Sequence, residues 1–174
     1  GTKICEKCWQ FITIATKVLD KALREDFGFE HIIWVFSGRR GAHCWVSDKR
    51  ARMLDEPKRR AVIEYLDILK NKGSKRLNLR RPYHPHLERS FNILKQEFIP
   101  VILKDQDPWR YNYDELLLKL PNQKVNNSLK ELWKRDPERS SFQKWQDIDD
   151  VAKKLQLKPL DLKLLVEAKQ DLIM

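Results

Sequence analysis

The sequence predicts a predominantly helical α+β protein that contains one β-hairpin. Only 5 of its 174 residues are glycine, and most apolar residues recur at intervals of three or four positions, as on one face of a helix. The exception is the β-branched and aromatic run Ile32–Phe36, which precedes a glycine-containing turn. A hydrophobic content of 41%, with 6 tryptophans, is sufficient for a packed core.

The first predicted helix covers residues 8–26, because its apolar side chains follow helical spacing and Phe27-Gly28 supplies a stop. Residues 31–47 predict a strand, a tight turn and a returning strand. Small apolar residues alternate with His43 and Trp45 on the returning strand, so these two side chains are expected on the open face. The packed face is expected to receive Ala42, Cys44 and Val46.

The next helix is expected to begin at Asp55-Glu-Pro57, followed by a basic connector over residues 70–81. Its inner stripe would contain Val62, Tyr65, Leu66 and Leu69, with Gly73 beyond its end. After Pro85 the pattern is wholly helical, and Pro100 is expected to kink or end the first of these helices. The change of composition near residue 82 predicts a basic α/β part, residues 1–82, and a helical subdomain, residues 83–174.

Within the second part, residues 105–111 predict a loop and residues 114–120 and 125–135 predict short helices. Ser140 and Gln143 have the spacing of a capping box, followed by an apolar face. That face contains Trp145, Ile148, Ala152 and Leu155. A last helix is expected from Pro159 to Met174.

The net charge of +10 is concentrated in residues 31–90, which hold 15 basic and 6 acidic side chains. This distribution favours a polyanionic ligand near the hairpin, although a solvated charged face is the alternative. No apolar run approaches the roughly 20 residues that span a bilayer, so neither a membrane partner nor a secretory leader is expected. Three cysteines, two of them in a Cys-X-X-Cys pair, favour a reducing compartment.

The turn from Ser37 to Gly41 combines groups that bind anions. Arg39 and Arg40 supply two guanidiniums, and His43 follows on the returning strand. Gly38 and Gly41 permit positive φ and expose backbone amides, while Ser37 adds a hydroxyl. A triphosphate is the natural ligand, and the alternative is a hairpin with two solvated arginines and a half-buried histidine.

Cys5 and Cys8 have the spacing of zinc ligands, but a structural zinc site needs four. Cys44 is the third cysteine and is expected on the packed face. Redox use of the pair is an alternative, although too few residues precede Cys5 for the strand of a thioredoxin-like unit. His84-Pro-His86 could bind a metal, but it is interpreted as a turn before a helix.

Two further groups of charged residues have plain structural interpretations. Asp147-Ile-Asp149 looks like a metal-binding pair, yet on a helix residues i and i+2 diverge by roughly 200°. Both acids are therefore expected on a solvated face. Six basic residues could contact template or product backbone, or could be helix-surface charges: Lys49, Arg50, Arg52, Lys58, Arg59 and Arg60.

The segment Ser37-Gly-Arg-Arg-Gly-Ala-His-Cys-Trp45 closely resembles the nucleotide-binding motif of the small, catalytic subunit of eukaryotic and archaeal DNA primases. Cys5-Glu-Lys-Cys-Trp9, Leu23–Phe29 and Arg81–Leu87 extend the resemblance in the family's order and spacing. The resemblance implies part of a primase-type mixed α/β catalytic core, followed by an all-helical subdomain.

Members of this family synthesise RNA primers on single-stranded DNA with two catalytic metal ions, Mg²⁺ or Mn²⁺. The resemblance implies that Ser37, Arg39, Arg40 and His43 contact the triphosphate, and that Gly38 and Gly41 shape the turn. It also assigns Cys5 and Cys8 to half of a structural Zn²⁺ site. The three metal-binding aspartates are expected outside this sequence, so the chain alone is expected to be inactive.

The partners implied by the resemblance are ribonucleoside triphosphates, the DNA template, the RNA primer, the primase large subunit and the DNA polymerase alpha complex, in the nucleus. Two alternatives remain open from the residues themselves. One is a non-enzymatic basic module that binds nucleic acid. The other is a structural helical fragment that contacts the large subunit.

Overall fold

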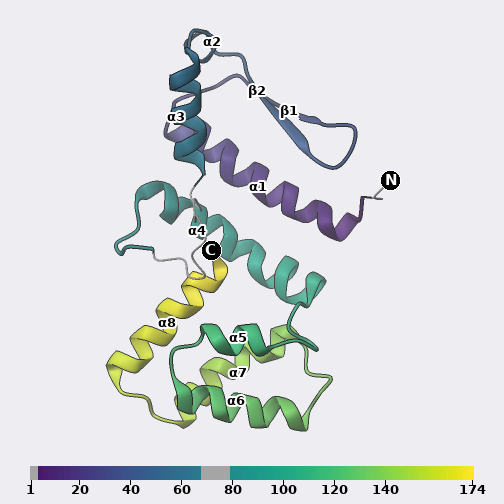
Figure 1. The fold of residues 1–174 in the computed structure, drawn as a ribbon, viewed down its shortest axis with the longest axis vertical. Coiled ribbons are helices and arrows are strands. Elements are labelled where there is room, and N and C mark those ends of the chain that lie inside the picture. Colours follow the sequence, from purple (N-terminus) through teal and green to yellow (C-terminus); the bar gives the residue numbers. More distant parts are fainter. Residues whose placement is uncertain (1–3, 68–78) are drawn as a thin grey trace. The chain divides into compact units, whose positions relative to one another are not determined.

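The computed structural model describes residues 4–67 and 79–174, and the chain divides into two compact units, residues 1–93 and 94–174 (Figure 1). The predicted α+β class is confirmed, because helices predominate and one two-stranded antiparallel sheet occurs in the described ranges. The division falls within helix α4 (Pro85–Glu97). The boundary near residue 82 was inferred from composition rather than contacts and stays a prediction.

Helix α1 (Glu6–Glu25) confirms the first predicted helix and begins two residues earlier than expected. Cys5 is its N-cap residue, and its buried side chains are Ile14, Ala22 and Leu23. The helix ends at Asp26 and the chain then turns through Gly28, whose φ is +65°. A Cβ at Gly28 would also lie 3.2 Å from the Arg50 guanidinium, so glycine suits this turn on two counts.

Strands β1 (Ile32–Phe36) and β2 (Ala42–Val46) form the predicted antiparallel hairpin. Trp34 lies on the face directed towards α1, where its indole N–H donates to the Asp20 carboxylate at 3.0 Å. The ring of Phe36 contacts the ring of Trp9 on the same helix. The hairpin therefore lies along α1 and is held there by contacts from one of its faces.

Helices α2 (Lys49–Arg52) and α3 (Glu56–Leu66) follow the hairpin. The predicted start of α3 is confirmed, because the Asp55 side chain accepts a hydrogen bond from the Lys58 N–H at 3.0 Å. Its predicted inner stripe is only half-buried at Val62, Tyr65 and Leu66. Leu69, Gly73 and most of the predicted basic connector lie outside the described residues.

A polar cluster ties the end of α1 to α3 and α4. The Asp26 carboxylate accepts from the Tyr65 hydroxyl at 2.8 Å and from two nitrogens of Arg89. Hydrogen bonds from Arg89 are the main cause that lowers the Asp26 pKa. His86 is buried and stacks on the Tyr65 ring at 5.0 Å between centroids. The segment around Pro85 thus leads into a helix, as predicted, with His86 in a packed position.

The expectation that Pro100 kinks or ends its helix is met only in part, because the α-helical register ends at Glu97 but the chain does not leave the helix. Helix α4 passes directly into a π-helix, η1 (Phe98–Gln106), and the chain stays helical through Pro100. Proline lacks the N–H that an α-helical hydrogen bond requires, and here the backbone register widens instead. The predicted loop consequently begins at Asp107, whose φ is +47°.

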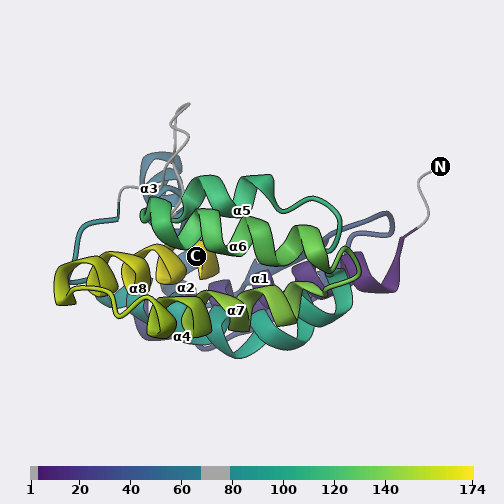
Figure 2. The same ribbon diagram turned by 90° about the horizontal axis from the view of Figure 1, so that it is seen from below.

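The second unit also contains helices α5 (Asp114–Lys119), α6 (Gln123–Arg135), α7 (Ser141–Lys154) and α8 (Pro159–Ile173). Figure 2 shows α6 beside α7, and these two helices pack against each other, as do α7 and η1. Their core contains Leu116, Leu117, Leu120, Val125, Leu129, Trp133, Ile148, Val151, Ala152 and Leu165. The predicted capping box at Ser140 and Gln143 is confirmed in both of its hydrogen bonds.

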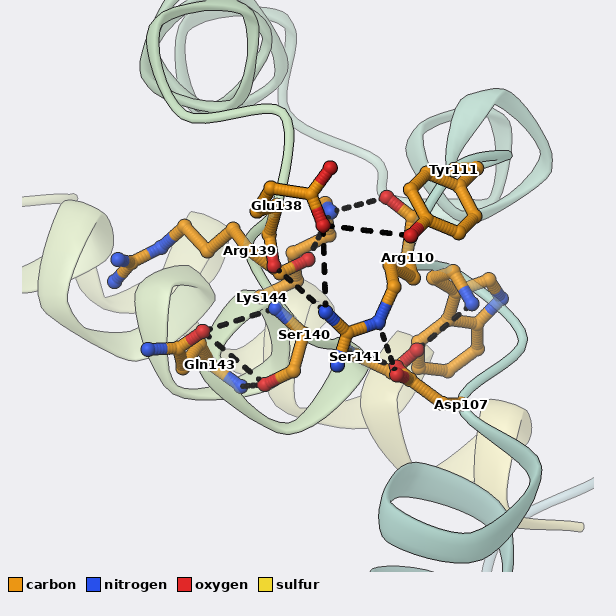
Figure 3. Close-up of polar contacts among 10 residues, drawn as sticks. Asp107, Arg110, Tyr111, Glu138, Arg139, Ser140, Ser141, Gln143 and Lys144 are labelled. Carbon is orange, nitrogen blue, oxygen red and sulfur yellow. Dashed lines mark hydrogen bonds and ion pairs between the residues drawn. The ribbon is translucent and has the colours of Figure 1, made fainter.

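A buried lysine organises the loop that follows η1 (Figure 3). Lys144 is fully buried, and its ammonium donates to the carbonyl oxygens of Arg110 and Arg139 at 2.8 and 2.6 Å. Burial is the main cause that lowers the Lys144 pKa. The Asp107 carboxylate accepts from the Ser141 N–H at 2.7 Å, and the Ser141 hydroxyl accepts from the Trp109 N–H at 2.8 Å. These bonds fasten the loop to the start of α7.

The prediction for Asp147 and Asp149 is half wrong. Both lie on helix α7, so they do not form a metal-binding strand pair. Asp149 is largely exposed and pairs with Lys169, as a solvated acid can. Asp147, however, is buried and accepts from the Trp133 indole N–H at 2.9 Å and from the Arg139 guanidinium. It is a core carboxylate whose charge is compensated by a neighbouring arginine.

None of the described helices has the length and apolar character needed to cross a lipid bilayer.

Candidate nucleotide-binding site

Ser37 shapes the turn between the two strands. Its N–H donates to the Gly41 carbonyl at 2.8 Å, and its hydroxyl oxygen accepts from the Gly41 N–H at 3.0 Å. Gly38 has a φ of +80°, which only glycine adopts without strain. Because the hydroxyl is used here as an acceptor, its proton is still available to donate to an anion. The turn is thus a closed loop held by its own hydrogen bonds.

Arg39, Arg40 and His43 are exposed, and their side chains form no hydrogen bond or ion pair with any residue in the ranges 4–67 and 79–174. Arg24 nearby behaves differently, since its guanidinium is paired with Asp20 at 2.8 Å. The two turn arginines therefore carry positive charge at the tip of the hairpin that no acid among the described residues compensates. Their convergence with His43 on a single ligand stays a prediction.

The open face of the hairpin is the predicted one. His43 is paired with Val35 across the sheet, and Trp45 is paired with Ile33. Paired residues share a face, and on this face Ile33 is 62% exposed and Trp45 is 66% exposed. Cys44 is paired with Trp34 and so lies on the opposite face, towards α1, but the expected packed position is wrong because its side chain is exposed. Partial desolvation is the main cause that raises its thiol pKa.

Asp48 closes the other end of the hairpin. Its carboxylate accepts from the N–H groups of Glu30 and His31 at 3.1 and 2.9 Å. The hydrogen bond from Glu30 is the main cause that lowers the Asp48 pKa to about 2, so this carboxylate is charged throughout the neutral range. Sequence reasoning missed this residue. The sequence signal that could have identified Asp48 was an acidic residue at the end of the second predicted strand. In a hairpin this position lies opposite the start of the first strand.

The six basic residues considered for nucleic-acid contact divide into two groups. Arg50 has a structural role, because its guanidinium donates to the Gly28 carbonyl at 2.8 Å and braces the turn before β1. Three others also have internal partners: Arg59 with the Arg52 carbonyl at 3.3 Å, Lys58 with Asp55 at 3.1 Å and Arg60 with Glu56 at 2.8 Å. The side chains of Lys49 and Arg52 have none among the described residues.

Cys5 and Cys8 lie at the N-terminal end of α1, exposed and free of a disulfide. Hydrogen bonding from Cys8 lowers the pKa of the Cys5 thiol, and the same interaction raises the pKa of Cys8. The lowered pKa makes the Cys5 thiol the easier of the two to deprotonate, and zinc is bound by thiolates. In the described part of the chain no three metal-ligating side chains come together. That the pair forms half of a four-ligand zinc site stays a prediction.

A sequence model of the family described as DNA primase small subunit matches residues 1–162. The chain belongs to the DNA primase small subunit family. The match includes Cys5, Cys8 and the whole hairpin. It therefore places both candidate sites within the part of the chain that is related to primases.

Curated primase small subunits agree with this assignment. The Saccharomyces cerevisiae protein is 46% identical over 181 residues, which cover 100% of this chain and 44% of the relative. The Schizosaccharomyces pombe protein is 48% identical over 179 residues, covering 99% of this chain and 39% of the relative. The Drosophila melanogaster protein is 49% identical over 112 residues, covering 62% and 26%. This primase-family chain thus spans about two-fifths of the length of its two yeast relatives.

Proposed function

We propose that this chain belongs to an enzyme that synthesises RNA primers on single-stranded DNA, and that its Ser37–Gly41 turn binds the triphosphate of the incoming ribonucleotide. The observation that carries the proposal is the pair of exposed guanidiniums, Arg39 and Arg40, with no internal partner among the described residues. A guanidinium binds phosphate through two parallel charge-assisted hydrogen bonds. A turn fixed by its own hydrogen bonds presents such groups with little loss of entropy.

Each group of the site has a role in this proposal. The arginines and His43 hold the phosphates, and the Ser37 hydroxyl donates to a phosphate oxygen. Glycine at position 38 permits the positive φ of the turn, and the space beside it is open, because a Cβ there would meet no atom within 4 Å. Trp45 and Ile33 continue the open face beyond His43 and give the site an apolar side.

The catalytic ions are proposed as Mg²⁺ or Mn²⁺ held by aspartates that this sequence does not contribute. Bound there, the ions would neutralise the charge that develops on the phosphates during nucleotidyl transfer. The chain's own residues would bind and orient the triphosphate. The proposal also includes a large-subunit partner, association with the DNA polymerase alpha complex and a location in the nucleus.

A competition between two polyanions tests the proposed function. We expect the chain to bind a ribonucleoside triphosphate with Mg²⁺ more tightly than a single-stranded oligonucleotide of equal charge, as measured by equilibrium titration. The reason is that a turn of fixed shape favours phosphates in one arrangement, whereas basic side chains spread over a surface do not distinguish one polyanion from another. Equal or tighter binding of the oligonucleotide, with a steep dependence on salt, would instead support the non-enzymatic nucleic-acid-binding module.

Zinc at Cys5 and Cys8 is a separate part of the proposal. In a primase that contains this chain, we expect one zinc ion per small subunit, held by these thiolates and two more. Replacing either cysteine with serine should lower the zinc content measured by elemental analysis, while Cys44→Ser should leave it unchanged. Zinc content that is equal in all three variants would remove Cys5 and Cys8 from the metal site.

A further inference from the structure

We infer that Trp9 is a positioning residue for the nucleotide-binding turn, acting through the ring of Phe36. The inference rests on the proposed function of the turn. Trp9 follows Cys8 in the first turns of α1, and Phe36 is the last residue of β1. Their ring centroids are 5.4 Å apart and the planes meet at 71°, an edge-to-face contact. Phe36 is bonded directly to Ser37, so the contact ends where the turn begins.

The turn depends on such a contact because its own bonds do not attach it to the rest of the unit. The hydrogen bonds of Ser37 close the turn onto itself. The hydrogen bonds of Asp48 and Arg24 act at the opposite end of the hairpin, at Glu30 and His31. The bond from the Trp34 indole to Asp20 of α1 lies two residues before Phe36, in the middle of the strand. A two-stranded hairpin is only marginally stable by itself. The Trp9 ring therefore adds a restraint at the residue adjacent to the turn, whose two guanidiniums have no partner in the ranges 4–67 and 79–174.

The position of this restraint determines its expected effect on the reaction. Trp9 reaches the turn only through Phe36, so it contributes to where Arg39 and Arg40 lie rather than to phosphate binding itself. A loosened turn must be ordered each time a nucleotide binds, and that ordering reduces affinity. Once the nucleotide is bound, the arginines are in place. The predicted signature is a raised KM for nucleotide with little change in kcat.

Leucine substitutions isolate the ring contact, because leucine keeps an apolar side chain on the helix and in the strand. Trp9→Leu and Phe36→Leu should each weaken triphosphate binding by about 2- to 12-fold, the range expected for an edge-to-face ring pair. The double variant should bind the triphosphate as tightly as whichever single variant has the lower affinity, because both changes remove the same contact. Trp9→Phe should restore most of the affinity. The measurement is equilibrium binding of a ribonucleoside triphosphate, with KM and kcat in the primase that contains the chain.

Phe11→Leu is the matched control, since Phe11 lies on the same helix, is 46% exposed and forms no ring contact with another described residue. The inference would be overturned if the fold-losses of triphosphate binding in the two single variants multiply in the double variant. It would also be overturned if Phe11→Leu weakens triphosphate binding as much as Trp9→Leu does. Arg40→Ala separates this failure from that of the proposed function. If Arg40→Ala weakens binding and Trp9→Leu does not, only the positioning role is lost. If neither variant weakens binding, the nucleotide site itself is wrong.

Discussion

Asp147→Ala is expected to destabilise the helical unit, residues 94–174, by about 2–4 kcal/mol, because it leaves Arg139 without its buried partner. The carboxylate also accepts from the indole N–H of Trp133, a fully buried core side chain. The expected cost begins below the roughly 3–5 kcal/mol range for breaking a fully buried ion pair, since the Arg139 side chain is still 25% exposed. Urea unfolding followed by circular dichroism measures the change.

The neighbouring acid of the same helix provides the control. Asp149 pairs with Lys169 but its side chain is 57% exposed, so Asp149→Ala should cost less than about 1 kcal/mol. Asp147→Asn should fall between the two, because an amide oxygen still accepts from Trp133 but carries no charge for Arg139. Equal destabilisation by Asp147→Ala and Asp149→Ala would show that the buried cluster does not stabilise the unit.

Features that depend on neighbours in the sequence could be predicted. The hairpin follows from the run Ile32–Phe36, the glycines of the turn and the alternation that places His43 and Trp45 on the open face. The start of α3 at Asp55 and the capping box at Ser140 involve partners only three positions away. Helix spacing likewise predicted that Asp147 and Asp149 diverge. In each case the deciding contacts lie within a few residues of one another.

Features that depend on distant partners could not be predicted. Asp147 was expected in solvent because its spacing says nothing of Trp133, 14 positions away on another helix. Arg50 looked like a candidate for nucleic-acid contact, yet its guanidinium is used by the Gly28 carbonyl 22 positions earlier. At Pro100 the rule applied was that of an α-helix, whereas the backbone adopts a π register that accommodates the proline.

The candidate site combines both kinds of feature. The residue types of the site and the position of its turn could be predicted from the sequence, and the resemblance to primases implied the phosphate-binding roles. The contacts that hold the hairpin on α1 could not be predicted, because Trp9 and Asp20 contact residues 27 and 14 positions away. The same is true of Asp48, which closes the base of the hairpin through Glu30 and His31, 18 and 17 positions away. The motif therefore predicted which residues would bind the ligand, and the fold shows which contacts keep the hairpin that carries them in place.

Arg39→Ala and Arg40→Ala are each expected to weaken ribonucleoside triphosphate binding by about 10- to 150-fold. A charge-assisted hydrogen bond to phosphate contributes about 1.5–3 kcal/mol, and each guanidinium supplies at least one. Arg40→Lys should recover only part of the loss, because an ammonium cannot form the planar pair of bonds. Unfolding stability should stay unchanged, because both side chains are exposed and neither forms a hydrogen bond or ion pair with another described residue. The assay is primer synthesis against nucleotide concentration, beside equilibrium nucleotide binding.

Template binding distinguishes a nucleotide site from a general basic surface. In the two alanine variants, single-stranded DNA binding should change much less than nucleotide binding, because Lys49 and Arg52 remain, whose side chains are not paired with any residue that the structure describes. Arg60→Ala is the charge-matched control: it also removes one exposed positive charge, but from a side chain already paired with Glu56. It should leave nucleotide dependence near normal. A surface that acts through net charge alone would give three equal, salt-dependent losses of DNA binding and no selective loss of nucleotide, and that result would reject the triphosphate site.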